Sequence, residues 1–119
     1  MNKYYVLSDF EAYDMEVTAW NNGHQNPTGS GYGFKLSAHD RDTNFQRDWK
    51  TIFVLLPGLP RAIEVNVEKK SFWNSTCREL ISKELGQWMI HNKYAPWSSG
   101  TPPKFRLYPD EGNHFRLEI

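Results

Sequence analysis

The stretch "TIFVLLPGLPRAIEVNVE", residues 51–68, carries the clearest structural signal in the chain. In its second half Ile63, Val65 and Val67 alternate with polar residues, which is typical of a strand with one buried face. Its first half, residues 51–56, is a continuous β-branched and aromatic run, which predicts a central strand covered on both faces. The letters PGLP between the two halves supply turn residues. The stretch therefore predicts an antiparallel hairpin.

Further segments show strand patterns on both sides of this hairpin. Residues 14–20 (DMEVTAW) and 34–38 (FKLSA) each place apolar side chains on one face, and residues 3–7 (KYYVL) form a candidate short strand. In residues 104–119 apolar and charged positions alternate before and after the letters PDEGN, which predicts a second hairpin.

Two connections contain many polar residues. Residues 21–33 include four glycines and three asparagines, which predicts a long loop. "SAHDRD", Ser37–Asp42, places a hydroxyl, an imidazole, two carboxylates and a guanidinium within six residues. On a strand Ser37 and His39 share one face while Asp40 points to the other, so a serine triad does not form. We therefore predict a solvated turn here.

One helix is predicted over residues 76–92. Its apolar residues trace a single stripe at helical spacing. They are Cys77, Leu80, Ile81, Leu85, Trp88 and Met89. Thr76 followed by Glu79 fits a capping box at its start. Gly86 lies off the stripe, where glycine costs about 1 kcal/mol relative to alanine, for no reason visible in the sequence.

Together these elements predict an α+β fold in a single domain, residues 1–119. The expected order is β-β-β-β-α-β-β. A mainly antiparallel sheet of five to six strands would carry one major helix packed on one face. Strand order is left open.

Composition narrows the function classes. Fourteen basic residues balance fourteen acidic ones, so the basic excess typical of nucleic-acid binding is missing and nucleic acid is an unlikely partner. One cysteine excludes an intramolecular disulfide, and no run approaches the ~18–20 apolar residues of a membrane span. We expect a cytoplasmic protein without membrane contact. The four scattered histidines match no zinc spacing and no glycine motif for phosphate precedes a helix, so we expect neither metal nor cofactor.

Aromatic residues are the unusual feature: five Trp, six Tyr and seven Phe in 119 residues. Such side chains dominate interface hot spots as well as cores. Trp20, Tyr32, Trp73 and Trp97 are the candidates for a ligand or interface surface, with a homodimer as the expected assembly. The alternative is that they plug the ends of a small sheet.

Two groups of residues suggest an enzyme, and each also has a purely structural explanation. In the hairpin of residues 51–68, Asp48 would lie beside Glu68 with Lys70 just beyond, an arrangement that suits Mg²⁺-dependent phosphodiester cleavage. The alternative is that these charged residues simply lie at the solvated ends of strands, where charged side chains are common. Cys77 with His91 or His39 would suit a thiol enzyme, but a cysteine on the buried stripe is typical of a core residue.

The second hairpin carries the one concentrated basic patch. Its residues are Lys104, Arg106, His114 and Arg116. This basic face would suit nucleic acid or an acidic partner, and it also matches a solvated sheet face that discourages edge-to-edge pairing.

The segment "PWSSGTPPKFRLYPDEGNHFRL" resembles the ending of small uncharacterised bacterial proteins with a Trp-x-x-Gly-x-Pro-Pro-Lys-Phe run before a final hairpin. The resemblance covers about a fifth of the chain. It implies a bacterial accessory protein of the mobile gene-cassette type and carries no catalytic residue onto this chain. The leading hypothesis from the sequence is a non-catalytic protein that acts by binding or self-association.

Overall fold

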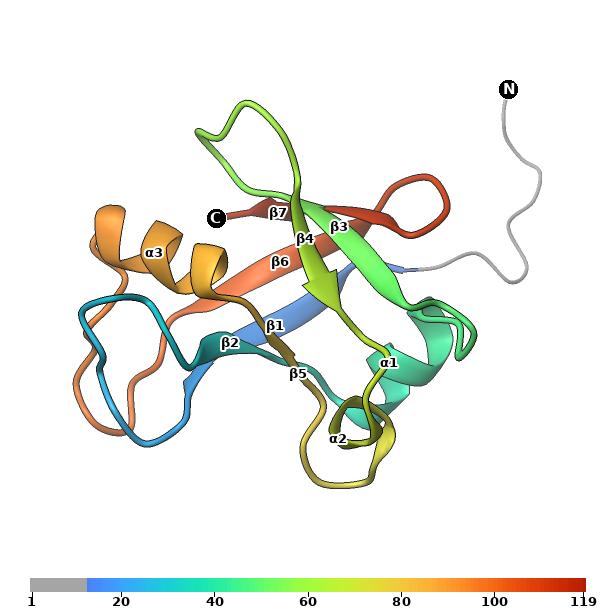
Figure 1. Ribbon diagram of the computed structural model, residues 1–119, viewed down its shortest axis with the longest axis horizontal. Coiled ribbons are helices and arrows are strands. Elements are labelled where there is room, and N and C mark those ends of the chain that lie inside the picture. Colours follow the sequence, from blue (N-terminus) through green and yellow to red (C-terminus); the bar gives the residue numbers. More distant parts are fainter. Residues whose placement is uncertain (1–12) are drawn as a thin grey trace.

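The computed structural model describes residues 13–119, which form one curled sheet with three short helices (Figure 1). The elements in chain order are β1 (Met15–Asn21), β2 (Tyr32–Lys35), α1 (Ala38–Asn44), β3 (Thr51–Leu55), β4 (Ile63–Asn66), α2 (Lys70–Trp73), β5 (Glu79–Ile81), α3 (Lys83–His91), β6 (Lys104–Pro109) and β7 (His114–Glu118). The strand predicted at residues 3–7 lies outside the described residues.

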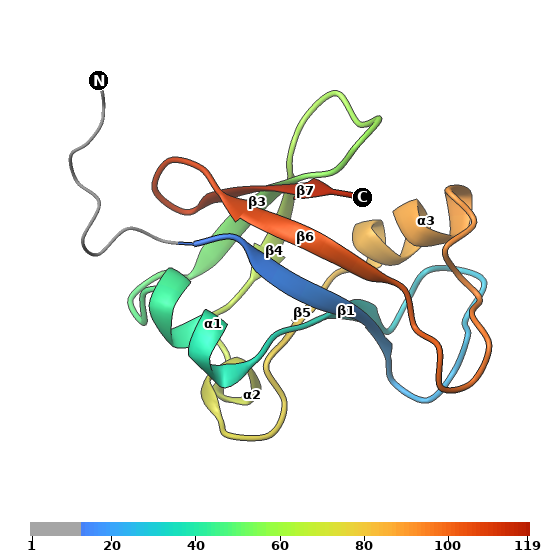
Figure 2. The same cartoon turned by 180° about the vertical axis from the view of Figure 1, so that it is seen from behind.

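The seven strands are ordered β4-β3-β7-β6-β1-β2-β5. Both predicted hairpins, β3–β4 and β6–β7, are antiparallel, but β3 and β7 run parallel and so make the sheet mixed. The sheet curls until its two edge strands, β4 and β5, come into contact, which gives a nearly closed barrel. Figure 2 shows the opposite wall, where β6 lies beside β1. The predicted antiparallel sheet with one major helix on a face is therefore wrong.

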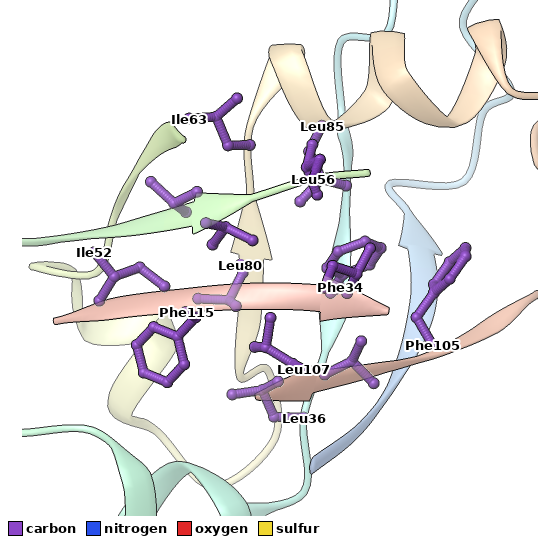
Figure 3. Close-up of a cluster of buried hydrophobic side chains, with 14 of the residues drawn as sticks. Phe34, Leu36, Ile52, Leu56, Ile63, Leu80, Leu85, Phe105, Leu107 and Phe115 are labelled. Atoms are coloured by element: carbon purple, nitrogen blue, oxygen red, sulfur yellow. The ribbon is translucent and has the colours of Figure 1, made fainter. Parts of the chain in front are cut away.

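The core fills the inside of this barrel. Figure 3 shows that strands far apart in sequence send side chains into it, among them Phe34, Leu107 and Phe115. The prediction that residues 51–56 are covered on both faces is wrong. Ile52 and Val54 are buried, whereas Leu55 is 42% exposed. In a barrel each strand has one inner and one outer face, so an apolar run does not require a second covering layer.

The helix predicted at residues 76–92 is shorter than expected. Residues 79–81 form β5, which pairs with β2, and α3 begins only at Lys83. Ser82 caps α3, because its hydroxyl accepts a hydrogen bond from the backbone N–H of Leu85 at 3.4 Å. The predicted capping box at Thr76 and Glu79 is therefore wrong. Pairing with β2 satisfies the backbone of Leu80 and overrides the helical pattern.

α3 packs against the long loop that joins β1 and β2. A Cβ atom at Gly86 would overlap the carbonyl oxygen of Gly29 in that loop, so only glycine allows the helix to approach so closely. On the core side Trp88 stacks on Tyr94 at 5.4 Å between ring centroids. The predicted loop is confirmed for residues 22–31, and its contact with the helix accounts for Gly86.

The segment "SAHDRD" begins a helix, so the predicted solvated turn is wrong. The Ser37 hydroxyl accepts a hydrogen bond from the backbone N–H of Asp40 at 3.1 Å and caps α1. Arg41 is only 6% exposed, and its guanidinium donates to the carbonyls of Phe72 and Asn74 at 3.0 and 2.6 Å. These polar side chains therefore cap α1 and hold it against α2.

None of the helices in residues 13–119 is long and apolar enough to cross a membrane.

Candidate functional site

A groove of about 600 Å³ lies between the β3–β4 connection and α3. Pro57, Gly58 and Leu59 form one wall, and Ile63 at the start of β4 continues it. Gly58 has a φ of +87°, a conformation that favours glycine, so the turn residues predicted from the sequence shape this wall. The groove thus opens where the main hairpin turns beside the helix.

Trp88 forms the floor of the groove and joins its two walls. The side chain is 4% exposed, and its indole Nε1 donates a hydrogen bond to the carbonyl of Pro57 at 2.8 Å. The ring also packs against Phe105 of β6, edge to face. A buried tryptophan whose N–H is satisfied holds both walls in fixed positions.

The other wall is polar and belongs to α3. Glu84, Gln87 and His91 are exposed along it, about one helical turn apart, and Asn92 follows at the C-terminal end. Asn92 is already engaged, because its side-chain amide donates to the carbonyl of Trp88 at 2.9 Å. Three polar side chains therefore face an apolar wall across the groove.

The groove was not predicted from the sequence, although one signal points to it. Leu59 lies in the turn, where polar residues are the rule, and it is 37% exposed. An apolar side chain at the tip of a hairpin is a reason to look for a binding surface there. What the sequence does not show is that α3 lies beside that tip.

The structure brings two of the four predicted aromatic candidates together. Tyr32 and Trp97 meet edge to face with ring centroids 5.8 Å apart. The Tyr32 hydroxyl donates to Gln25 at 3.1 Å, and burial raises the pKa of this phenol. Trp97 is half-buried against the core, so this pair supports the loop of residues 22–31. Trp20 lies half-buried on β1, and Trp73 lies on α2.

The residues predicted for metal-dependent cleavage lie near the beginning of α2 and in the connection before β3. Asp48 is exposed in that connection. Glu68 and Lys70 line a shallow hollow together with Arg47, Lys69 and Trp73. Within residues 13–119, no group of three or more His, Cys, Asp or Glu side chains is placed to hold a metal ion.

The predicted basic face is interleaved with acidic side chains. Lys104 pairs with Glu16 at 3.9 Å and Arg106 with Asp14 at 3.1 Å. On the next strand Arg116 pairs with both Asp110 and Glu118, and the His114 ring stacks on Phe53 at 4.8 Å. The sequence did not reveal the partners on β1, because pairing of β1 with β6 joins segments about 90 residues apart.

Cys77 is not on a buried helical stripe. It lies half-buried in the turn between α2 and β5, where the Asn74 amide approaches its Sγ at 3.6 Å. The Asn74 carboxamide oxygen also accepts hydrogen bonds from the N–H groups of Thr76 and Cys77 and so shapes this turn.

No protein-family model, curated protein or solved structure matches this chain.

Proposed function

We propose that this protein is a non-catalytic binding domain that takes up a small amphipathic ligand in the groove between Pro57–Leu59 and α3. The observation that carries the proposal is the groove itself. Its volume of about 600 Å³ falls within the ~300–1,000 Å³ of typical small-molecule sites. Ligand sites also favour the mouths of β-barrels and combine apolar walls with a few polar groups.

The two walls indicate the class of ligand. Pro57, Leu59 and Ile63 offer an apolar surface to a flat or branched hydrocarbon body. Opposite them, the carboxylate of Glu84 and the carboxamide oxygen of Gln87 accept hydrogen bonds, whereas Nε2 of Gln87 already donates to the carbonyl of Thr28 at 3.4 Å. An amine or amide attached to an apolar ring would satisfy both walls at once.

The fixed floor supports binding with little reorganisation. Trp88 is held by its hydrogen bond to Pro57 and by stacking on Tyr94, so the ligand would not have to order it. Preorganised sites retain more of the interaction free energy as affinity.

A screen of amphipathic amines and amides by thermal shift tests this proposal, with hits mapped by backbone amide chemical shifts. A ligand at a hundred times its dissociation constant stabilises the protein by about 2.7 kcal/mol, or on the order of ten degrees. Leu59→Ser should weaken binding about tenfold, because it removes roughly 1.5 kcal/mol of apolar contact. Glu84→Gln should weaken cationic ligands more than amides.

The matched control is Leu55→Ser, which replaces a leucine of similar exposure on the outer face of β3. Binding in this variant should equal that of the original protein. Equal losses in both leucine variants, or shifts that map away from α3 and residues 57–63, would contradict the proposal. The predicted homodimer is tested separately by sedimentation equilibrium.

A further inference from the structure

A second hollow lies beside α2. In the ribbon view α2 lies next to α1 and away from α3 (Figures 1 and 2). It measures about 310 Å³. Three segments line it. Arg47 comes from the connection before β3, Glu68 and Lys69 come from the connection after β4, and Lys70 and Trp73 come from α2. Three cations and one carboxylate therefore surround an indole ring.

Trp73 provides a fixed flat surface in this hollow. The guanidinium carbon of Arg47 lies 4.6 Å from the centroid of its ring, and that of Arg41 lies 5.3 Å away. Arg41 is itself held by the carbonyls at the end of α2 and by Asp42 at 3.0 Å. The buried arginine fixes the indole, while Arg47 is exposed and faces solvent.

The cations of the hollow differ from those of the outer sheet face. On that face Lys104, Arg106 and Arg116 all pair with carboxylates. Within residues 13–119, Arg47, Lys69 and Lys70 make no ion pair shorter than 4.0 Å. In that part of the chain no carboxylate is paired with these three cations, which favours the binding of an anion from solution.

Lys69 is the least solvated cation of the hollow. Its ammonium is half-buried, and this loss of solvent lowers its pKa, while Glu79 and Cys77 oppose the change in part. An anion in the hollow would replace the lost solvation of the ammonium.

We propose that this hollow binds a phosphorylated small molecule that carries an aromatic ring, of which a nucleoside monophosphate is the simplest example. Lys69 and Lys70 would hold the phosphate, and the ring would stack on the guanidinium plane of Arg47 beside Trp73. The volume of the hollow suits one such molecule, at the lower end of the ~300–1,000 Å³ seen for ligand sites.

Titration of the whole protein with adenosine 5′-monophosphate, adenosine and inorganic phosphate tests the site, followed by amide chemical shifts. The monophosphate should bind at least tenfold more tightly than either fragment and perturb residues 68–73. Lys70→Gln should weaken it about tenfold. Arg47→Lys keeps the charge but loses the flat guanidinium, so it should weaken the monophosphate and leave phosphate binding unchanged.

Lys104→Gln is the control, because it removes one basic charge from the ion-paired outer face. It should bind the monophosphate like the original protein. Three outcomes would overturn the proposal: adenosine binding as tightly as the monophosphate, an equal loss in Lys104→Gln, or a single-stranded oligonucleotide that binds while the monophosphate does not. Thermal unfolding of each variant confirms that its fold is intact. The screen of amines and amides tests the groove beside α3, whereas the monophosphate titration tests the hollow beside α2. A negative result at one site therefore does not affect the interpretation of the other.

Discussion

At the scale of single residues, Gly86 shows how one missing methyl group determines packing. Gly86→Ala should destabilise the protein by about 2 kcal/mol. Alanine gains about 1 kcal/mol of helix propensity, but its Cβ would overlap the carbonyl oxygen of Gly29, and the loop backbone would have to move. Urea unfolding should show a midpoint lower by about 1 M, given a slope of ~1–3 kcal/mol/M.

Lys83→Ala is the control for Gly86→Ala, since it changes an exposed residue in the same helix. Its unfolding midpoint should stay within the ~0.5 kcal/mol expected of surface changes. If Gly86→Ala were as stable as the original protein, the close packing of α3 on the β1–β2 loop would be wrong.

Residue-level inference from the sequence succeeded where the relevant neighbours are local. Alternation in residues 14–20 predicted one apolar face, and the apolar residues of that face, Met15, Val17 and Ala19, are all buried in β1. It failed for Arg41, whose hydrogen-bond acceptors at Phe72 and Asn74 are more than thirty residues away. From the sequence alone an arginine is expected at the surface, because the distant carbonyls that make its burial possible cannot be identified.

At the scale of elements, the start of α3 is the sharpest disagreement between the sequence prediction and the structure. Ser82→Ala should destabilise the protein by about 1 kcal/mol, because it removes the side-chain acceptor for the N–H of Leu85. Thr76→Ala should change stability little, because Thr76 is exposed and precedes β5. Thermal unfolding of the two variants makes the comparison directly.

The reverse result would contradict the short helix. If Thr76→Ala cost about 1 kcal/mol and Ser82→Ala cost nothing, the helix would begin at residue 76 as the pattern predicted. The apolar pattern of residues 76–92 gave the wrong prediction because Leu80 would be buried both in a helix and in β5. A strand of three residues is too short for alternation to distinguish it from a helical turn. The hairpins were predictable because each pairs two segments that follow one another along the chain.

At the scale of the whole molecule, β7 joins two parts of the sheet. On one side it pairs with β6, which continues to β1, β2 and β5, and on the other it pairs in parallel with β3. A chain that ends at Asn113 should therefore not fold. It loses Phe115, which stacks on Phe45 at 4.8 Å in the core, and it leaves the β3–β4 hairpin hydrogen-bonded to no other strand of the sheet.

Circular dichroism and the dispersion of amide resonances measure this loss. A chain that ends at Glu118 is the control, because it removes only the exposed Ile119, and it should fold like the original protein. A folded chain ending at Asn113 would contradict the joining role of β7.

The joining role of β7 could not be predicted from the sequence. The segment 114–118 was predicted to pair with residues 104–109, and that pairing is confirmed. Its second partner, Phe53 to Leu55, lies about sixty residues earlier, and nothing in either pattern specifies the pair. Closure of the sheet into a barrel depends on such distant pairs, so the predicted fold class was wrong although most strands were predicted.

The central place of β7 also has a consequence for protein synthesis. A ribosome synthesises a chain from its N-terminus at ~5–20 residues per second, and the part that has emerged can begin to fold during synthesis. Until residues 114–118 emerge, β3–β4 and the strands on the other side of β7 have no partner to join them. We therefore expect the nascent chain to stay open to proteases and chaperones until residues 114–118 have emerged, and to become resistant in one step when β7 is free to pair.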